Sequence, residues 1–214
     1  MPELFLIENQ EINTEVFSTS SEVFLHKDIL EILFRYKEKI CNKFNDLRGT
    51  FLIDHLAINI IDPSNKIVIF SSTPSVEYNL ISQGLWRHDK SFSVSYQMKN
   101  RFYSWETAYE ENHFEKLKLI KQINHGFSCG FNLSKKIGSF QFIYSFATRH
   151  QKPDLLEYYR GHINELFSIG NYGYKSISGI YEKRFGKVIT NPELSENKSI
   201  GFFPPFLKLI SNNK

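Results

Sequence analysis

The 214-residue sequence predicts an α/β fold in which a five-stranded antiparallel sheet is flanked by helices on both faces, as an α-β-α sandwich. Two pairs of strand-like runs are each joined by a short polar turn, which indicates antiparallel neighbours. Segments with apolar residues at helical spacing precede, separate and follow these pairs. Hydrophobic residues make up 41% of the chain and charged residues 23%, so the chain has enough apolar surface for one folded domain.

The first predicted helix lies within residues 20–47. Apolar side chains recur there at mostly helical spacing, and Arg48 and Gly49 follow as a helix end. The recurring positions are Phe24, Ile29, Leu33, Tyr36, Ile40 and Phe44. Because residues 1–19 show no clear period, we expect an N-terminal arm there, one domain over residues 20–185, and an irregular tail over residues 186–214.

A β-hairpin is predicted next. The stretch from His55 to Asp62 alternates between two faces, and the stretch from Lys66 to Ser72 is rich in β-branched residues. One face of the first strand carries Leu56, Ile58 and Ile60, and the other carries His55, Ala57 and Asn59. The intervening Asp-Pro-Ser-Asn is typical of a type I turn.

The middle of the chain predicts two helices with a short strand between them. Thr73 and Pro74 begin a helix that reaches Gly84 and carries Val76 and Leu80 on its apolar face. Residues 85–100 have mixed signals and are expected to form a long loop, followed by a strand over residues 101–105. A helix is predicted for residues 106–124, with Ala108, Phe114, Leu117 and Ile120 buried.

The last pair of strands is predicted at residues 126–133 and 139–148, with a polar turn over residues 134–138. Alternation in the second strand places Phe140, Phe142, Tyr144 and Phe146 on one face, and Gln141, Ile143, Ser145 and Ala147 on the other. Pro153 then opens a helix to Ile169 that resumes after a glycine-containing stretch and reaches Phe185. Such a sandwich is of the PAS or GAF kind, and it leaves space for a small molecule between the sheet and one helical layer.

Composition excludes several functional classes. The net charge is +3 without a dense Lys/Arg run, which argues against a dominant nucleic-acid surface. Apolar stretches are too short to cross a membrane, and the N-terminus lacks the features of a secretory signal. Two cysteines are too few for a disulfide framework. A cytoplasmic setting is therefore expected.

Enzymatic and metal chemistry receive little support from spacing. Cys129 has His125 and His150 in the same part of the chain, which leaves a cysteine-dependent enzyme as one alternative. Nothing in the spacing fixes the geometry of these groups, and a small buried residue in a strand is the simpler role for Cys129. The seven histidines show no paired ligand spacing, so we expect neither a metal nor a cofactor.

A polar and aromatic cluster surrounds the expected loop. Its members are Trp86, Asp89, Tyr103, Trp105 and Glu106. A carboxylate beside indole and phenol groups can accept a hydrogen bond from an amide while the indole or phenol donates to a carbonyl. This combination suits recognition of a small amide or lactone. The alternative is that Trp105 packs in the core and Asp89 caps a turn.

Several short motifs follow one another within residues 55–149. They are the hairpin, the Asp of WRHD at 86–89, the Trp of FYSW at 102–105, a helix, GFSCGF at 126–131, and a strand led by Gly138. In this order they resemble the autoinducer-binding sensor domain of LuxR-type quorum-sensing regulators. The resemblance covers the central half of the chain and extends plausibly to the flanking helices.

The resemblance implies a ligand site. Asp89 would accept from the amide N–H of an acyl signal molecule, and Trp105 would donate to its lactone carbonyl. Tyr103 and Ser145 are further candidates, and Val76 and Leu80 stand where the family usually carries an aromatic pair. Gly126 and Gly130 match paired glycines at which the backbone packs closely.

The resemblance also implies how the chain acts. Family regulators continue into a helix-turn-helix domain, whereas residues 186–214 are too few and too rich in Pro, Asn and Ser for one, so we expect no direct DNA binding. The expected role is a sensor that binds a small amphipathic signal, an acyl-homoserine lactone or another, and forms a homodimer or a heterodimer with a full-length regulator. The alternatives are a ligand-free interaction module that pairs with or inhibits such a regulator, and the cysteine-dependent enzyme.

Overall fold

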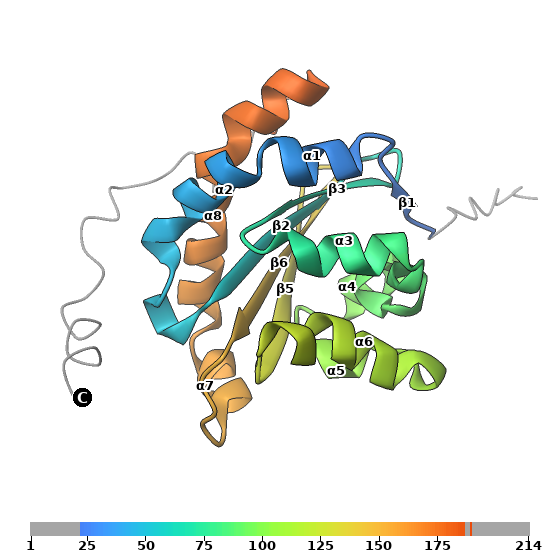
Figure 1. Ribbon diagram of the computed structural model, residues 1–214. Helices are drawn as coiled ribbons and strands as arrows, with labels where there is room; N and C mark the ends of the chain where they lie inside the picture. The colour runs from blue at the N-terminus through green and yellow to red at the C-terminus, as the bar shows by residue number, and fades with distance from the viewer. Residues whose placement is uncertain (1–21, 187–188, 190–214) are drawn as a thin grey trace, which may run out of the picture.

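The computed structural model describes residues 22–186 and 189, which form a six-stranded sheet with helices on both faces (Figure 1). The strand order is β1-β3-β2-β6-β5-β4, and every neighbouring pair is antiparallel except β1 with β3. The strands are β1 (Phe24–Leu25), β2 (His55–Ile61), β3 (Lys66–Ser71), β4 (Phe102–Ser104), β5 (Cys129–Ile137) and β6 (Phe140–Thr148). The predicted sandwich is confirmed, with one more strand than expected.

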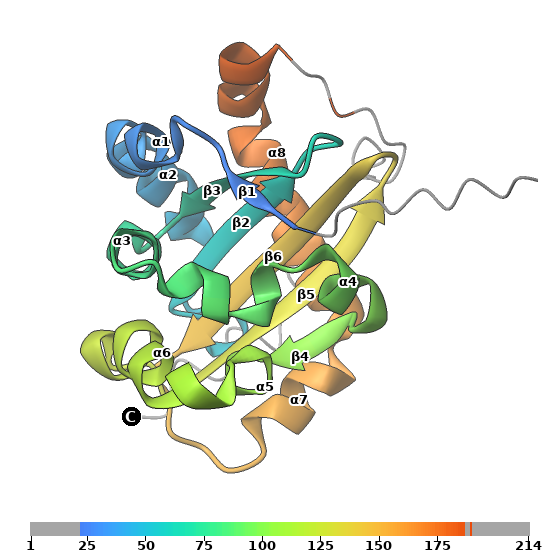
Figure 2. The ribbon, with the colours of Figure 1, turned by 90° about the vertical axis from the view of Figure 1, so that its right-hand side faces the viewer.

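The helices form two layers. Figures 1 and 2 show α2, α7 and α8 on one face of the sheet and α3 to α6 on the other, with α1 beside β3. The helices are α1 (Ile29–Arg35), α2 (Lys37–Phe44), α3 (Pro74–Ser82), α4 (Val94–Lys99), α5 (Trp105–Ala108), α6 (Phe114–Lys121), α7 (Leu155–Gly161) and α8 (Ile163–Phe185). Short 3-10 turns lie between them: η1 (Asn45–Leu47), η2 (Thr50–Leu52), η3 (Leu85–His88), η4 (Lys90–Phe92), η5 (Glu111–His113) and η6 (Ile123–His125).

The extra strand β1 lies inside the region predicted as one helix. The backbone N–H of Phe24 donates to the carbonyl of Asn65 at 2.8 Å, and that of His26 donates to Ile67 at 3.0 Å. This pairing with the edge of β3 outweighs the helical apolar spacing at Phe24. The rest of the predicted helix is present as two helices, α1 and α2, because the chain bends at Tyr36 between them.

The middle of the chain differs most from its prediction. The expected loop of residues 85–100 forms η3, η4 and α4, and the expected helix of residues 106–124 is divided into α5, η5, α6 and the start of η6. The cause of the division is a tertiary contact. Tyr109 forms an isolated β-bridge with Asp89, and the N–H of Glu110 donates to the carbonyl of His88 at 3.0 Å, which keeps this stretch extended.

Both predicted hairpins are observed, although β5 begins at Cys129 rather than at residue 126 and includes most of the turn expected at residues 134–138. β2 and β3 pair as expected, and β5 and β6 are joined by a tighter turn than expected, at which Gly138 has a φ of 57°. The final helix is interrupted at His162 rather than at the glycine-containing stretch of residues 170–173. Gly170 stays within α8 because its lack of a Cβ admits the ring of Tyr144, which would lie 2.1 Å from such an atom.

The two faces of the sheet are both buried but differ in chemistry. The face toward α2, α7 and α8 is apolar and aromatic, with Ile58, Phe131 and Phe142 at its centre. The face toward α3 to α6 combines a smaller apolar cluster with buried polar side chains. Its polar positions on the strands are His55, Asn59, Ser71, Asn132, Ser134, Gln141 and Ser145. Buried polar groups cost free energy unless they are hydrogen-bonded, so this face is the candidate for function.

None of the helices within residues 22–186 combines the length and apolar character that a membrane crossing requires. The expected arm at residues 1–19 lies outside the described residues, as does the expected tail at residues 186–214 except for Gly186 and Ile189.

The two glycines of the GFSCGF motif serve different purposes. Gly126 follows η6 with a φ of 66°, a conformation that glycine adopts without strain, and has open space around it. Gly130 lies under Trp105, so that a Cβ would stand 2.2 Å from the indole ring. Close packing, predicted for both glycines, is therefore observed only at Gly130.

We expect Gly130→Ala to lower the free energy of unfolding by about 3 kcal/mol, because the methyl group and the Trp105 ring cannot share one place. Urea denaturation followed by circular dichroism measures the change. Gly179→Ala is the matched control, since Gly179 is exposed on α8 with nothing within 4 Å of its Cβ position. That control should gain about 0.5–1 kcal/mol from helix propensity. Equal losses in both variants would contradict the packing argument.

Candidate functional site

A row of side chains crosses the polar face of the sheet. The strand register places Tyr103 of β4 opposite Asn132 of β5, Asn132 opposite Ser145 of β6, and Ser145 opposite Ala57 of β2. Paired residues in neighbouring strands project to the same side. The row therefore presents a phenol, an amide and a hydroxyl beside one another, under the helical layer.

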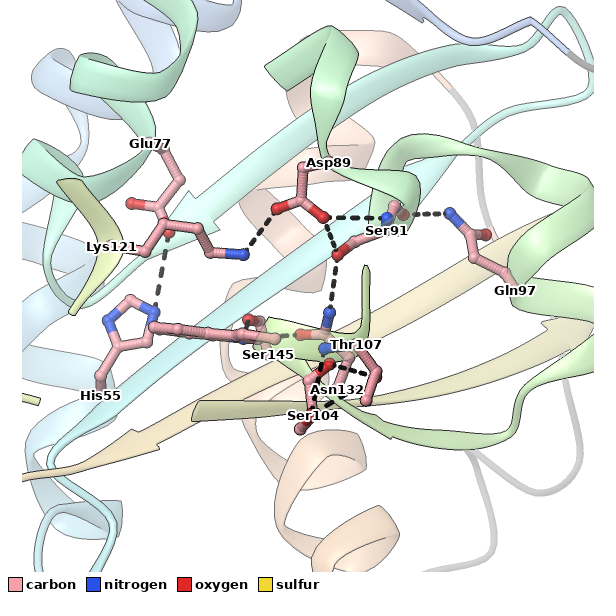
Figure 3. A network of polar contacts seen from close by, with 11 residues as sticks. His55, Glu77, Asp89, Ser91, Gln97, Ser104, Thr107, Lys121, Asn132 and Ser145 are labelled. Atoms are coloured by element: carbon pink, nitrogen blue, oxygen red, sulfur yellow. Dashed lines mark hydrogen bonds and ion pairs between the residues drawn. The ribbon is translucent and has the colours of Figure 1, made fainter. Parts of the chain in front are cut away.

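A buried ion pair lies above this row (Figure 3). Lys121 Nζ is 2.6 Å from Asp89 Oδ2, and the two side chains are 5% and 0% exposed. Asp89 Oδ1 also accepts from the backbone N–H of Ser91 at 2.9 Å and from the Ser91 hydroxyl. The ammonium lies 4.4 Å from the centre of the Trp105 ring and 5.1 Å from that of Tyr109. The lysine is thus held by one carboxylate and by two aromatic faces.

Hydrogen bonds connect the ion pair to the sheet. Asn132 Nδ2 donates to Ser91 Oγ at 3.0 Å. The indole N–H of Trp105 is shared between Asn132 Oδ1, at 3.0 Å, and Ser145 Oγ, at 2.9 Å. The connection therefore runs without a break from Lys121 through Asp89, Ser91, Asn132 and Trp105 to Ser145. Such a network fixes the orientation of each member when every group is satisfied.

Local structure explains how Asp89 reaches this position. It is the residue before η4, where it caps the turn through Ser91, and its backbone is held by the β-bridge to Tyr109. Gln97 of α4 adds a hydrogen bond from its amide to the Ser91 carbonyl at 2.6 Å. The expected loop is therefore an ordered layer formed by η3, η4 and α4, here called the wall, and it places the Asp89 carboxylate inside the domain.

Trp105 is positioned by the junction of β4 and α5. It is the first residue of α5, whose start is capped by Ser104 accepting from the N–H of Thr107 at 3.2 Å. Its ring packs flat against the Gly130 backbone and lies edge-on to His55 and Phe127. The alternative roles considered from sequence, a core tryptophan and a turn-capping aspartate, are both observed, and both groups also belong to the buried polar network.

A second acidic group lies on the other side of Lys121. Glu77 of α3 is buried, with one carboxyl oxygen 3.7 Å from His55 Nε2. Burial raises the pKa of Glu77 from 4.5 to about 7, although the Ser71 hydroxyl opposes the shift. Burial also lowers the pKa of His55 to about 3, with the charge of Lys121 acting in the same direction. A neutral imidazole therefore lies beside a carboxyl that ionises near neutrality.

Several buried polar atoms on this side of the sheet have no hydrogen-bond partner. They are both ring nitrogens of His55, Asn59 Oδ1, Glu77 Oε2, Gln97 Oε1 and the hydroxyls of Tyr103 and Tyr109. Native proteins leave few such groups unsatisfied, and unpaired ones cost about 1–3 kcal/mol each. These atoms gather in one layer, in which the Tyr103 hydroxyl interacts with Asn132 and Ser91 and the Tyr109 hydroxyl with Gln122.

The residues predicted from sequence converge. Asp89, Trp105 and Ser145 belong to one network, the Tyr103 hydroxyl lies beside it, and Val76 and Leu80 pack in the same apolar cluster as Trp105. Whether they bind a ligand stays a prediction.

Sequence reasoning missed the other members of the site. They are Lys121, Ser91, Asn132, Glu77 and His55. Two signals were present. Polar residues alternate with apolar ones on strands that are buried on both faces, and Lys121 follows the buried Ile120 on the helix.

Cys129 does not have the character of a nucleophile. Burial raises the pKa of its thiol to about 11, with the charge of Glu106 adding to the shift. A catalytic thiol needs the opposite change, because the thiolate is the reactive form. Cys129 and His150 line an open hollow of about 560 Å³ between the α5–α6 side and α7. A second open hollow, of about 420 Å³, lies outside the wall that carries Asp89.

A double-mutant cycle should measure the buried ion pair. Lys121→Met leaves the Asp89 charge without its partner and should cost about 3–5 kcal/mol in unfolding free energy. Adding Asp89→Asn to that variant should recover part of the loss, giving a coupling of several kcal/mol between the two sites. The exposed pair of Glu157 and Arg160, 3.6 Å apart, provides the control cycle, whose coupling should stay below about 1 kcal/mol. Similar coupling energies in the two cycles would count against a structural role for the buried pair.

The raised pKa of Glu77 predicts a pH-dependent stability. The folded state holds this proton more tightly than the unfolded state, so the contribution is complete below pH 4.5 and is lost as the pH rises through about 7. Between pH 5 and pH 8, the free energy of unfolding of Glu77→Gln should therefore rise by about 3 kcal/mol relative to that of the wild type. Because Glu77 lies 3.7 Å from His55, the comparison measures the ionisation of the pair rather than of Glu77 alone.

Urea denaturation at several pH values measures this difference. The matched control is Glu115→Gln, since Glu115 is exposed on α6. Parallel pH profiles for the wild type and Glu77→Gln would show that Glu77 ionises normally.

No protein-family model matches the chain, and no curated protein matches it. Its fold is similar to solved structures of LuxR-family ligand-binding domains. Escherichia coli SdiA matches with a TM-score of 0.48 and 10% identity over 72% of this chain, and this chain spans 64% of SdiA. SdiA in complex with octanoyl-rac-glycerol matches with a TM-score of 0.46 and 12% identity, and the match covers 76% of this chain and 68% of SdiA. CepR2 from Burkholderia cenocepacia is an N-acylhomoserine lactone-dependent LuxR-family transcription factor. It matches with a TM-score of 0.47 and 10% identity, and the match covers 75% of this chain and 95% of CepR2.

Proposed function

We propose that this chain is a ligand-binding sensor domain that takes a small amphipathic signal molecule between the sheet and the layer of α3 to α6. The observation that carries the proposal is the group of buried, unpartnered polar atoms on this one face. A ligand with both donors and acceptors would satisfy them. The opposite face has its aromatic core, in which the described residues leave the Tyr174 hydroxyl unpartnered.

The polar head of the ligand would lie near Lys121. The ammonium has three N–H donors, of which one reaches Asp89 while the aromatic faces of Trp105 and Tyr109 cover others. Because the charges of Asp89 and Lys121 cancel, the site suits a neutral head with carbonyl or hydroxyl oxygens. The unpartnered hydroxyls of Tyr103 and Tyr109 supply further donors.

The apolar tail would lie along the smaller core cluster. Val76 and Leu80 of α3 belong to this cluster together with Ile69 and Ile143 of the sheet. Burial of a short acyl chain contributes about 0.8 kcal/mol for each methylene. An amphipathic molecule therefore matches the site better than a wholly polar one.

The proposal includes the setting in which the chain acts. We infer a cytoplasmic regulator that pairs with a second copy or with a full-length relative, without direct DNA contact. Ligand binding would complete the packing of the α3–α6 side and so favour one rigid arrangement of the domain.

A second candidate is a ligand-free interaction module. The observation in its favour is that the chain itself already satisfies the key groups. Asp89 is neutralised by Lys121, the Trp105 N–H is shared by Asn132 and Ser145, and the indole ring rests on Gly130. In this role the layer would be a closed core, and only a protein partner would bind.

Thermal unfolding with two compounds separates these candidates. N-octanoyl-homoserine lactone and octanoyl-rac-glycerol each offer a neutral oxygen-rich head and an eight-carbon chain. A ligand present at a hundred times its dissociation constant stabilises the folded state by about 2.7 kcal/mol, which corresponds to a rise in Tm of a few degrees. Native mass spectrometry of the protein as purified from cells would detect a ligand carried through purification.

Tyr103→Phe and Tyr174→Phe form the matched pair for this experiment. Each removes a buried hydroxyl that lacks a partner, one on the polar face and one on the opposite face. We expect Tyr103→Phe to reduce the ligand-induced shift and Tyr174→Phe to retain it. An absence of any shift or bound mass would instead support the ligand-free module.

A further inference from the structure

Outside the buried network, three side chains with metal-binding groups meet at the surface. His88, Glu110 and His113, here called the triad, each offer one ligand atom, and all three atoms lie within 4.8 Å of one another. Glu110 Oε2 is 2.7 Å from His88 Nδ1 and 3.9 Å from His113 Nδ1. The two imidazole rings are stacked, with their centres 3.5 Å apart.

The backbone holds the triad together. The N–H of Glu110 donates to the carbonyl of His88 at 3.0 Å, and the N–H of His113 donates to the carbonyl of Glu110 at 3.0 Å. These bonds adjoin the β-bridge of Asp89 with Tyr109, so the triad connects the same two segments on the outer side. These bonds fix the backbone of the three residues and keep their side chains close together, which lowers the entropic cost of binding.

A second observation that points to an ion at the triad is a ring nitrogen of His113 without a hydrogen-bond partner. His113 Nδ1 is buried and has no hydrogen-bond partner, although the rest of its ring is partly exposed. In the tautomer with its hydrogen on Nε2, this atom carries a lone pair and lies 3.9 Å from Glu110 Oε2. A cation beside Glu110 would satisfy it.

The distances are close to those that a tetrahedral ion requires. Zn²⁺ binds histidine nitrogen and carboxylate oxygen at about 2.0–2.2 Å, which places two ligand atoms about 3.3 Å apart. The distance from Glu110 Oε2 to His88 Nδ1, 2.7 Å, must therefore lengthen by about 0.6 Å. The distance from Glu110 Oε2 to His113 Nδ1, 3.9 Å, must shorten by about the same amount. Because stacked rings cannot both point their lone pairs at one ion, one imidazole must also rotate. The His88 and His113 side chains are 35% and 29% exposed, which leaves room for the rotation.

We propose that the triad binds Zn²⁺, or a divalent transition ion of similar character, with water completing the coordination. Two imidazoles and one carboxylate form a ligand set that suits such an ion better than Mg²⁺ or Ca²⁺, which prefer oxygen. Binding would replace the proton between His88 and Glu110 and join the segment of Asp89 to the segment of Tyr109. The ion would thus stabilise the wall of the buried site from outside. Spacing along the chain does not predict this site, because His88 lies far in sequence from Glu110 and His113.

Calorimetric titration of the full chain, free of any histidine tag, with ZnCl₂ tests the proposal. We expect one ion per chain and a rise in Tm with Zn²⁺. Co²⁺ serves as a second probe, because a tetrahedral site gives intense visible absorption whereas the hydrated ion gives weak bands. Charge-transfer absorption from a thiolate would reveal binding by Cys41 or Cys129 instead and would overturn the assignment.

Variants of the triad identify the ligands. Glu110→Gln and His113→Asn should each weaken Zn²⁺ binding at least about tenfold and remove the tetrahedral Co²⁺ spectrum. His150→Gln is the matched control, since His150 is exposed and lies outside the triad, and it should bind like the wild type. The Tm of each variant without metal checks that it is folded. Equal Zn²⁺ affinity in the wild type and the triad variants would overturn the proposal.

Discussion

The ion pair of Asp89 and Lys121 is the interaction on which the polar half of the domain depends. Both groups are almost fully buried, so each would be strongly destabilising without the other. Asp89 anchors the wall formed by η3, η4 and α4, and Lys121 anchors α6. Their contact closes the helical layer over the sheet, and the hydrogen bonds through Ser91 and Asn132 extend the closure to Trp105.

The sheet separates two different kinds of core. Toward α8 it packs rings and branched chains, which provide stability without polar specificity. Toward α3 it carries amides, hydroxyls and an imidazole that the chain satisfies only in part. A domain built for stability alone would gain from apolar residues there. The polar groups retained on this face are the observation on which the proposed binding function rests.

Much of the architecture was predictable because strand alternation and turn chemistry are local. β2 with β3 and β5 with β6 were found from patterns of a few residues, and Asp89, Trp105 and Ser145 were found as members of one site from the order of short motifs. Lys121 was not found, because a lysine next to a buried isoleucine on a helix is ordinarily at the solvent boundary. Only the approach of Asp89 from a distant segment makes its burial favourable.

Local sequence pattern was enough to predict the strands of both hairpins and the face that each of their residues occupies. These properties follow from backbone sterics and from the two-residue period of a strand. Tertiary contacts set where the long helical stretches break, that β1 joins the sheet, where close packing requires a glycine, and which polar groups pair. Those outcomes depend on contacts between segments distant in sequence, such as Tyr109 with Asp89 and His88 with Glu110, whose free energies no local pattern contains.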